Sequence, residues 1–206
     1  MPGEFIAVAE DTGLIIPIGE WVLNQACNQL ARWATSPSTA ELTLAINVSA
    51  LQFHRTDFAQ QVFAALERSG ASPQKLKIEP TESVLLDDTD ITITTMTLLR
   101  KRGVRFSLDD FGTGYSSLAY LQKLPIDQLK IDKSFVHNLP DDENSGKIAR
   151  AIIALCNSLG LTVIAEGVET RAQLQFLEDN GCEFFQGYLF GAAVSIDEFE
   201  SQIKPI

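Results

Sequence analysis

The chain has 206 residues, of which 45% are hydrophobic and 21% charged, a composition typical of a globular domain with one substantial core. Sixteen basic and 27 acidic residues give a net charge of −11, which argues against duplex nucleic acid as the main partner because such binding requires cationic neutralisation of phosphates. The sequence contains neither an apolar run long enough to span a bilayer nor a secretion signal at its start, so we expect a cytoplasmic chain without a membrane span.

Cysteines and histidines do not form a recognisable metal motif. Cys27, Cys156 and Cys182 are odd in number, widely spaced and set in apolar segments, which indicates buried reduced thiols rather than disulfides or a zinc site. His54 and His137 stand apart from any Cys/His cluster, so a catalytic or ligating histidine is not expected.

Short β-rich runs alternate with helical runs along the chain. The expected strands are residues 42–48, 76–79, 104–109, 128–131, 161–165 and 183–187. Several of them are almost continuously apolar, as is typical of strands covered on both faces. The expected helices are residues 18–33, 58–69, 148–159 and 171–180, with a last helix that starts near Ser195.

The ends of these helices carry recognisable signals. Gly70 and Gly160 follow the second and third helices, as is typical of a helix C-terminus. Thr170 is a plausible N-cap for the fourth, and Ser195 with Glu198 suggests a capping box for the last. Residues 91–99 are ambiguous because their β-branched side chains alternate, but their position between two strands favours a helix.

Alternation of strands and helices predicts a parallel sheet. An open doubly wound sheet and a (β/α)8 barrel both fit this order. No G-x-G-x-x-G sequence follows any of the strands, which disfavours a dinucleotide-binding open sheet. Polar residues at the strand ends favour the barrel, in which all of these ends lie on one rim.

The polar residues at the strand ends indicate a metal site. They are Asn47, Glu79, Asp109, Asp110, Lys130, Asp132, Glu166 and Gln186. Carboxylates with an amide oxygen suit one or two Mg²⁺ or Mn²⁺ ions, and two such ions can clamp an in-line displacement at phosphorus. Lys130 would supply positive charge near the nucleophile. Taken singly, each residue could instead be a solvated strand end or a helix cap, and an enolase-type barrel also uses carboxylates, Mg²⁺ and a lysine.

The segment FGTGYSSLAYL follows the paired aspartates. Its Gly112 and Gly114 flank Thr113, and glycines here would allow unusual backbone angles and close approach of a ligand. An ordinary turn between a strand and a helix is the alternative.

Six segments together resemble one known family. They are AEDTGLIIPIGEWVL, INVSALQF, IEPTESVL, DDFGTGYSSLAYLQKLPIDQLKIDKSFV, IAEGVET and CEFFQGYLF. In this order they resemble the EAL-domain family of bacterial cyclic-di-GMP phosphodiesterases, and the long DDFGTGYSSL segment is highly specific and makes an enolase-type barrel unlikely. The resemblance implies a modified (β/α)8 barrel with two metal ions that hydrolyses cyclic-di-GMP to linear pGpG.

The resemblance also implies roles for individual residues. Asn47, Glu79, Asp109 and Asp110 resemble metal ligands, and Asp110 also resembles a holder of the attacking water. Lys130 and Glu166 resemble the water-activating pair, with Glu166 as general base. The remaining matches are Glu82 as anchor of the glycine-containing loop, and Glu169, Gln186, Asp132, Gly112, Thr113 and Gly114 as residues that line the site. A homodimer and an upstream sensory or diguanylate cyclase domain are further expectations.

The sequence departs from the family pattern at its start. No Glu-Ala-Leu tripeptide occurs before Asn47, although the family carries this metal-binding motif on its first strand. We therefore expect residues 1–206 to be a single, N-terminally truncated domain, and a barrel that lacks its first strand. The alternative to an active phosphodiesterase is a catalytically impaired receptor for cyclic-di-GMP or a protein-interaction module. Pro80 and Ala192–Ala193 are smaller departures.

Overall fold

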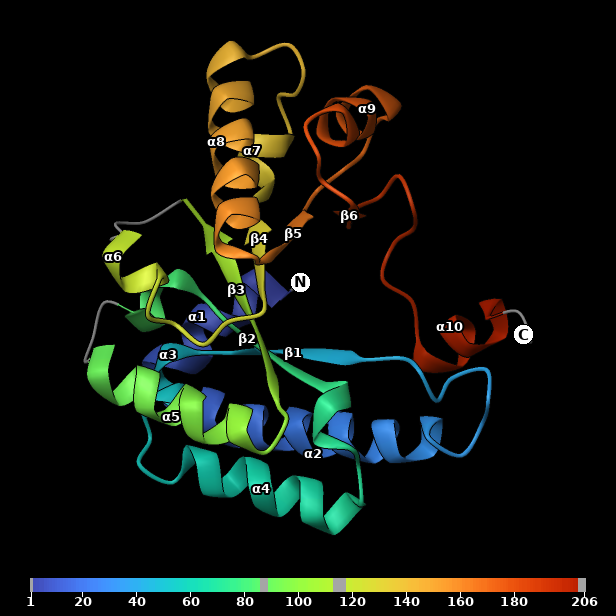
Figure 1. Ribbon diagram of the computed structural model, residues 1–206. Coiled ribbons are helices and arrows are strands. Elements are labelled where there is room, and N and C mark those ends of the chain that lie inside the picture. The colour runs from blue at the N-terminus through green and yellow to red at the C-terminus, as the bar shows by residue number, and fades with distance from the viewer. Residues whose placement is uncertain (1, 86–88, 113–117, 204–206) are drawn as a thin grey trace. The chain divides into compact units, whose positions relative to one another are not determined.

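The computed structural model describes residues 2–85, 89–112 and 118–203, and Figure 1 shows their helices and strands. They form two compact units. Unit 1 comprises the chain up to Phe106 together with the C-terminal residues from Ser201, and unit 2 comprises Ser107–Glu200. The chain passes from the first to the second within strand β3 (Arg105–Phe111).

Unit 1 contains a parallel arrangement of strands flanked by helices. Strand β1 (Leu44–Val48) pairs in parallel with β2 (Leu76–Pro80), and β2 pairs in parallel with the first residues of β3. The helices of this unit are α1 (Pro2–Asp11), α2 (Ile15–Trp33), α3 (Ala50–Phe53), α4 (Phe58–Ser69), η1 (Pro73–Lys75), η2 (Glu82–Leu85) and α5 (Thr89–Lys101). Parallel strands require such helical connections, because the chain must return to the same end of the sheet before each new strand.

The core of unit 1 lies where α2 packs on β1 and α4. Leu23 and Leu30 bury the inner face of α2, and Phe58 and Val62 bury that of α4. Gly19 allows α2 to approach α3 closely, because a Cβ atom there would collide with the side-chain amide of Gln52.

Unit 2 repeats the same construction. The rest of β3, β4 (Gln128–Ile131), β5 (Thr162–Ala165) and β6 (Phe184–Phe185) pair in parallel in that order. Its helices are α6 (Leu118–Leu121), α7 (Lys133–Val136), α8 (Glu143–Leu159) and α9 (Arg171–Asp179), and α10 (Ile196–Gln202) follows near the end of the chain. Helix α8 packs on β4 and β5, which covers the apolar side chains Leu129 and Val163.

The elements confirm most of the local predictions. All six expected strands are present, although the last is confined to Phe184–Phe185. The ambiguous segment at residues 91–99 is helical within α5. Gly70 and Gly160 end their helices in the left-handed conformation, and the Thr170 side chain caps α9. Helix α1 was not predicted from the sequence. In the part of the chain that the structure describes, no helix has the length and apolarity needed to cross a bilayer.

The three cysteines are buried and unpaired, as expected from the sequence. Burial raises the pKa of the Cys27 thiol to about 11 and that of the Cys156 thiol to about 12, from an ordinary value of 9.0. Since the thiolate is the reactive form, we expect Ellman's reagent to label Cys27 at least about 100-fold more slowly in the native chain than in concentrated urea. Equal labelling rates in the two conditions would contradict this packing.

Candidate functional site

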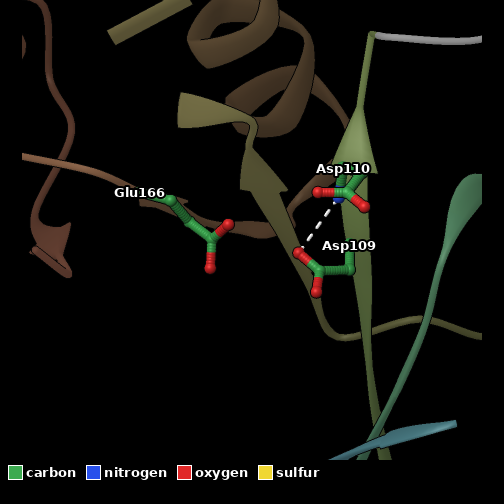
Figure 2. Close-up of side chains that lie close together, drawn as sticks. All are labelled: Asp109, Asp110 and Glu166. Atoms are coloured by element: carbon green, nitrogen blue, oxygen red, sulfur yellow. Dashed lines mark hydrogen bonds between the residues drawn. The ribbon is translucent and has the colours of Figure 1, made fainter. Parts of the chain in front are cut away.

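Three carboxylates meet in unit 2 where β3 and β5 end. One carboxylate oxygen each of Asp109, Asp110 and Glu166 lies within 4.8 Å of the other two. Figure 2 shows Asp109 and Asp110 projecting from β3, and Glu166, the residue that follows β5, facing them. Hard divalent cations bind oxygen ligands at about 2.0–2.6 Å, so one cation can bridge oxygens at this spacing.

A break in the strand register brings both aspartates to the cluster. Successive side chains of a regular strand point to opposite faces, so Asp109 and Asp110 would normally diverge. Between Leu108 and Phe111, however, the pairing of β3 with β4 shifts. Asp110 adopts a left-handed conformation with φ of 54°, which aspartate tolerates better than most residues. Its backbone N–H donates to Asp109 Oδ1 over 3.0 Å.

Lys130 lies between the two strands that carry the carboxylates. Its side chain is buried, and its Nζ lies 3.1 Å from Asp109 Oδ1 and 2.6 Å from Glu166 Oε1. The ammonium group therefore holds one carboxylate from each neighbouring strand. Three carboxylates and one ammonium leave the ionised cluster with two negative charges, which one divalent cation would neutralise.

Electrostatics at Asp110 favour a bound cation. Burial raises the pKa of the Asp110 carboxyl, the charges of Asp109 and Asp132 raise it further, and Lys130 lowers it. The ionised form of Asp110 is thus destabilised in the metal-free protein. A cation at the cluster would offset that destabilisation, because an opposite charge at short range favours the ionised form of a carboxyl group.

Asp132 is held beside this cluster by the start of α7. Its Oδ1 accepts hydrogen bonds from the backbone N–H of Ser134 over 3.0 Å and from the Ser134 hydroxyl. These bonds cap α7 and fix the orientation of the Asp132 side chain, which is buried. Its negative charge contributes to the raised pKa of the Asp110 carboxyl, so it influences a candidate metal ligand.

The loop after β5 lies against the segment around β6. Gln186 donates its backbone N–H to the Ala165 carbonyl over 2.8 Å and accepts from the Val168 N–H over 3.0 Å. Glu169 lines a cavity of about 370 Å³ in unit 2, and its fellow lining residues are Lys133, Ser134, His137, Asn138 and Gly167. The predicted lining residues Glu169 and Gln186 therefore belong to one connected loop region next to Glu166.

In the segment that follows β3, Gly112 is left-handed with φ of 97°, an unusual backbone angle of the kind predicted for the glycines there. Thr113 and Gly114 lie outside the described residues.

Three further predicted residues lie in unit 1. Asn47 on β1 and Glu79 on β2 are register partners, so their side chains share one face of the sheet. Asn47 is exposed and Glu79 is buried. Glu82 is buried in η2, directly after β2. Pro80 pairs with Val48 at the end of β2, so the strand continues to the proline.

Sequence reasoning missed Gln173. Thr170 was identified as a helix cap, but Gln173 completes the capping box three residues later. The T-x-x-Q pattern is a signal that could have identified this residue. The bond from Gln173 Nε2 to the His137 carbonyl, at 3.0 Å, carried no local signal because the two residues are far apart in the sequence.

Parallel strands with helical connections and a carboxylate cluster at the strand ends define an α/β protein of the TIM-barrel-like class. The family model described as "EAL domain" matches residues 1–193. The chain therefore belongs to the EAL domain family, whose modified barrel is the fold class predicted from the sequence.

Named relatives and solved structures agree with this assignment. The chain is 43% identical over 202 residues to the bifunctional diguanylate cyclase/cyclic di-GMP phosphodiesterase MucR of Pseudomonas aeruginosa. The aligned region covers 98% of this chain but only 29% of MucR. A solved structure of the PaMucR phosphodiesterase with c-di-GMP superposes with a TM-score of 0.93 at 44% identity, covering 97% of this chain and 80% of that one. A manganese/c-di-GMP complex of Klebsiella pneumoniae BlrP1 has a TM-score of 0.71 at 29% identity, covering 82% of this chain and 44% of that one.

Proposed function

We propose that this chain hydrolyses cyclic-di-GMP to linear pGpG with bound Mg²⁺ or Mn²⁺. The observation that carries the proposal is the cluster of Asp109, Asp110 and Glu166 within 4.8 Å, bridged by Lys130. Family membership and the relatives that are named cyclic di-GMP phosphodiesterases support the choice of substrate. The manganese complex of a structural neighbour supports the choice of ion.

The proposed ligands are Asp109 and Asp110 in unit 2, and Asn47 and Glu79 in unit 1. Their donor set of carboxylates and an amide oxygen fits hard divalent cations. When bound, such ions supply a polarised phosphate and an activated water. Asp132 adds a further negative charge close to Asp110, which favours a cation at the cluster.

Glu166 is the proposed general base. Its Oε1 is held by the Lys130 ammonium at 2.6 Å, which fixes the orientation of the carboxylate. The carboxylate accepts a proton from the attacking water as the water oxygen bonds to phosphorus. The bond between phosphorus and the 3′ oxygen breaks, and that oxygen takes a proton to become a hydroxyl. The product then carries a 5′-phosphate at the cleaved end, as in pGpG.

The other predicted residues have supporting roles in this proposal. Glu169 and Gln186 line the loop region beside Glu166 and contact either the substrate or the residues that bind the metal ions. Gly112, Thr113 and Gly114 are further proposed lining residues, and the two glycines would allow close approach of a ligand. Glu82 is assigned as anchor of the glycine-containing segment by resemblance to the family alone. The other assignments rest on the family resemblance and on the positions of the residues next to the strand ends.

Metal removal tests the proposal directly. We expect the chain to convert cyclic-di-GMP to pGpG with Mn²⁺ or Mg²⁺, and EDTA to lower the rate at least about 100-fold, because the ionised cluster needs a cation to hold an anionic substrate. Anion-exchange chromatography separates substrate from product. Linear pGpG serves as a control for further cleavage.

Calorimetric titration with cyclic-di-GMP, under the same conditions, distinguishes catalysis from binding. Binding without cleavage would replace the proposed enzyme with a receptor for the dinucleotide. If the chain neither binds nor cleaves cyclic-di-GMP, the dinucleotide is not its ligand, and a role in protein interaction is left.

A further inference from the structure

The side chain of Gln173, at the start of α9, joins two loops of unit 2. Its exposed fraction is 3%. The amide oxygen Oε1 accepts the backbone N–H groups of Glu169 at 2.7 Å and Thr170 at 2.9 Å. The amide nitrogen Nε2 donates to the carbonyl oxygen of His137 at 3.0 Å. One buried amide group therefore satisfies three backbone groups from two separate segments.

Each of these segments leads to the carboxylate cluster. His137 is the C-cap of the short helix α7, and Asp132, the N-cap of that helix, directly follows β4, the strand that carries Lys130. Glu169 lies three residues after Glu166, in the loop that follows β5. The bonds of Gln173 thus join the loop of the proposed general base to the loop that follows its lysine partner.

The two loops also touch at a second point. Gly167 is left-handed with φ of 68°, and a Cβ atom there would lie 2.6 Å from Lys133 Cβ. Glu166 donates its backbone N–H to the Ile131 carbonyl at 3.2 Å. The loop after β5 is therefore held against the end of β4 and against α7 by close backbone contacts, and Gln173 holds its far end.

We propose that Gln173 is a positioning residue that keeps Glu166 at the correct distance from Lys130 and the metal-binding cluster. This inference rests on the proposed function, since it gives Glu166 its catalytic task. Residues behind a metal ligand or a catalytic group commonly change affinity or activity about 10–100-fold when they are replaced. A displacement of about 1 Å can by itself cost about 100-fold in rate.

Helix capping is the alternative role for Gln173, and one substitution separates the two. In Gln173→Glu the side chain keeps both acceptor bonds to Glu169 and Thr170, so the cap of α9 is retained and an acidic group is favourable at a helix N-terminus. The ionised carboxylate cannot donate to the His137 carbonyl. Its negative oxygen atoms are instead repelled by the partial negative charge of that carbonyl oxygen. The link between the loops is lost while the cap remains.

The test compares Gln173→Glu and Gln173→Leu with the control Gln175→Leu in the full chain. Gln175 lies on the same helix, is exposed, and bonds only locally to Asp179 at 2.8 Å. Steady-state cleavage of cyclic-di-GMP gives kcat and KM, calorimetric titration with Mn²⁺ gives metal affinity, and urea unfolding reports stability. We expect Gln173→Glu to lower kcat about 10–100-fold with KM within about threefold. We also expect it to weaken Mn²⁺ binding about tenfold, because the Glu166 carboxylate lies within 4.8 Å of the candidate ligands Asp109 and Asp110 and adds negative charge to the cluster.

We expect Gln173→Glu to unfold at a lower urea midpoint than the control, because it places a charge at a buried position and leaves the His137 carbonyl without its donor. The rates and affinities are therefore compared at a urea-free condition in which both chains are folded. If Gln173→Glu keeps kcat and Mn²⁺ affinity within about twofold of Gln175→Leu, the positioning role is wrong and Gln173 only caps α9.

If the unsubstituted chain binds Mn²⁺ but cleaves nothing, the proposed function fails. The Mn²⁺ affinity of Gln173→Glu then decides the positioning role alone. If the unsubstituted chain binds no Mn²⁺, both ideas fail. Should Gln173→Leu not fold, the glutamate variant still decides.

Discussion

Replacing Glu166 by glutamine is expected to lower kcat for cyclic-di-GMP hydrolysis by about 10³–10⁴-fold. The amide is nearly the same size as the carboxylate but cannot take a proton from the attacking water. It also carries no charge to pair with the Lys130 ammonium, which lies 2.6 Å from the Glu166 carboxylate. We expect KM to change much less than kcat, because the proposed task of Glu166 lies in the chemical step.

Glu178→Gln is the matched control for this substitution. Glu178 is exposed on α9, and its replacement removes the same charge from the same unit. We expect its kcat to remain within about twofold of the unsubstituted chain, as is usual for surface changes. If Glu166→Gln loses less than about tenfold in kcat, another group must accept the proton and the assignment of the general base is wrong.

Replacing Lys130 by methionine is expected to destabilise the metal-free chain by about 3 kcal/mol. The ammonium is buried and lies within 3.1 Å of both Asp109 and Glu166, so its removal leaves two carboxylates facing each other without a counter-charge. Methionine fills a similar volume, which limits any loss from packing. Urea unfolding in the presence of EDTA measures this effect.

Mn²⁺ should restore most of the stability of Lys130→Met, because a divalent cation at the cluster neutralises the same two carboxylates. At 100 times its Kd, an ion that binds only the folded state adds about 2.7 kcal/mol. Catalysis should not recover, since the proposed partner of Glu166 is still missing. A Lys130→Met chain that loses stability but gains none from Mn²⁺ would show that the cluster is not a metal site.

Lys147→Met provides the corresponding surface control. Lys147 pairs with Glu143 at 2.8 Å, but both side chains are largely exposed, at 60% and 79%. Exposed ion pairs contribute little, so the expected loss is about 0.5 kcal/mol or less, with no dependence on Mn²⁺. The comparison therefore separates the loss of any lysine from the loss of the buried one.

The strand ends show how far the sequence alone could go. Asp109, Lys130 and Glu166 are predicted to share a site because the C-terminal ends of parallel strands share one edge. The structure places the Lys130 ammonium 3.1 Å from Asp109 and 2.6 Å from Glu166. Their catalytic roles remain predictions. The bounds of the elements were predictable where apolar runs and helix caps were strong, as in α4, which spans Phe58–Ser69 as expected.

Local patterns failed where the relevant contact was distant or the local signal was weak. The β-branched residues at 91–99 alternate as in a strand, so only the position of this segment between two strands predicted the helix that α5 forms there. Helix α1 was not expected, although Pro2 occupies its first position, where proline is favoured. Gln173 was missed because its partner His137 lies on a different loop.

By itself, the sequence determined the family, the alternation of strands and helices, and the set of acidic residues at the strand ends, because periodicity and motif spacing are local properties of the chain. Only the tertiary structure decided that adjacent Asp109 and Asp110 both reach the cluster, since a regular strand would send them to opposite faces. The register shift in β3 and the left-handed backbone of Asp110 resolve that conflict. These features depend on pairing between strands that are distant in sequence, which no local pattern encodes.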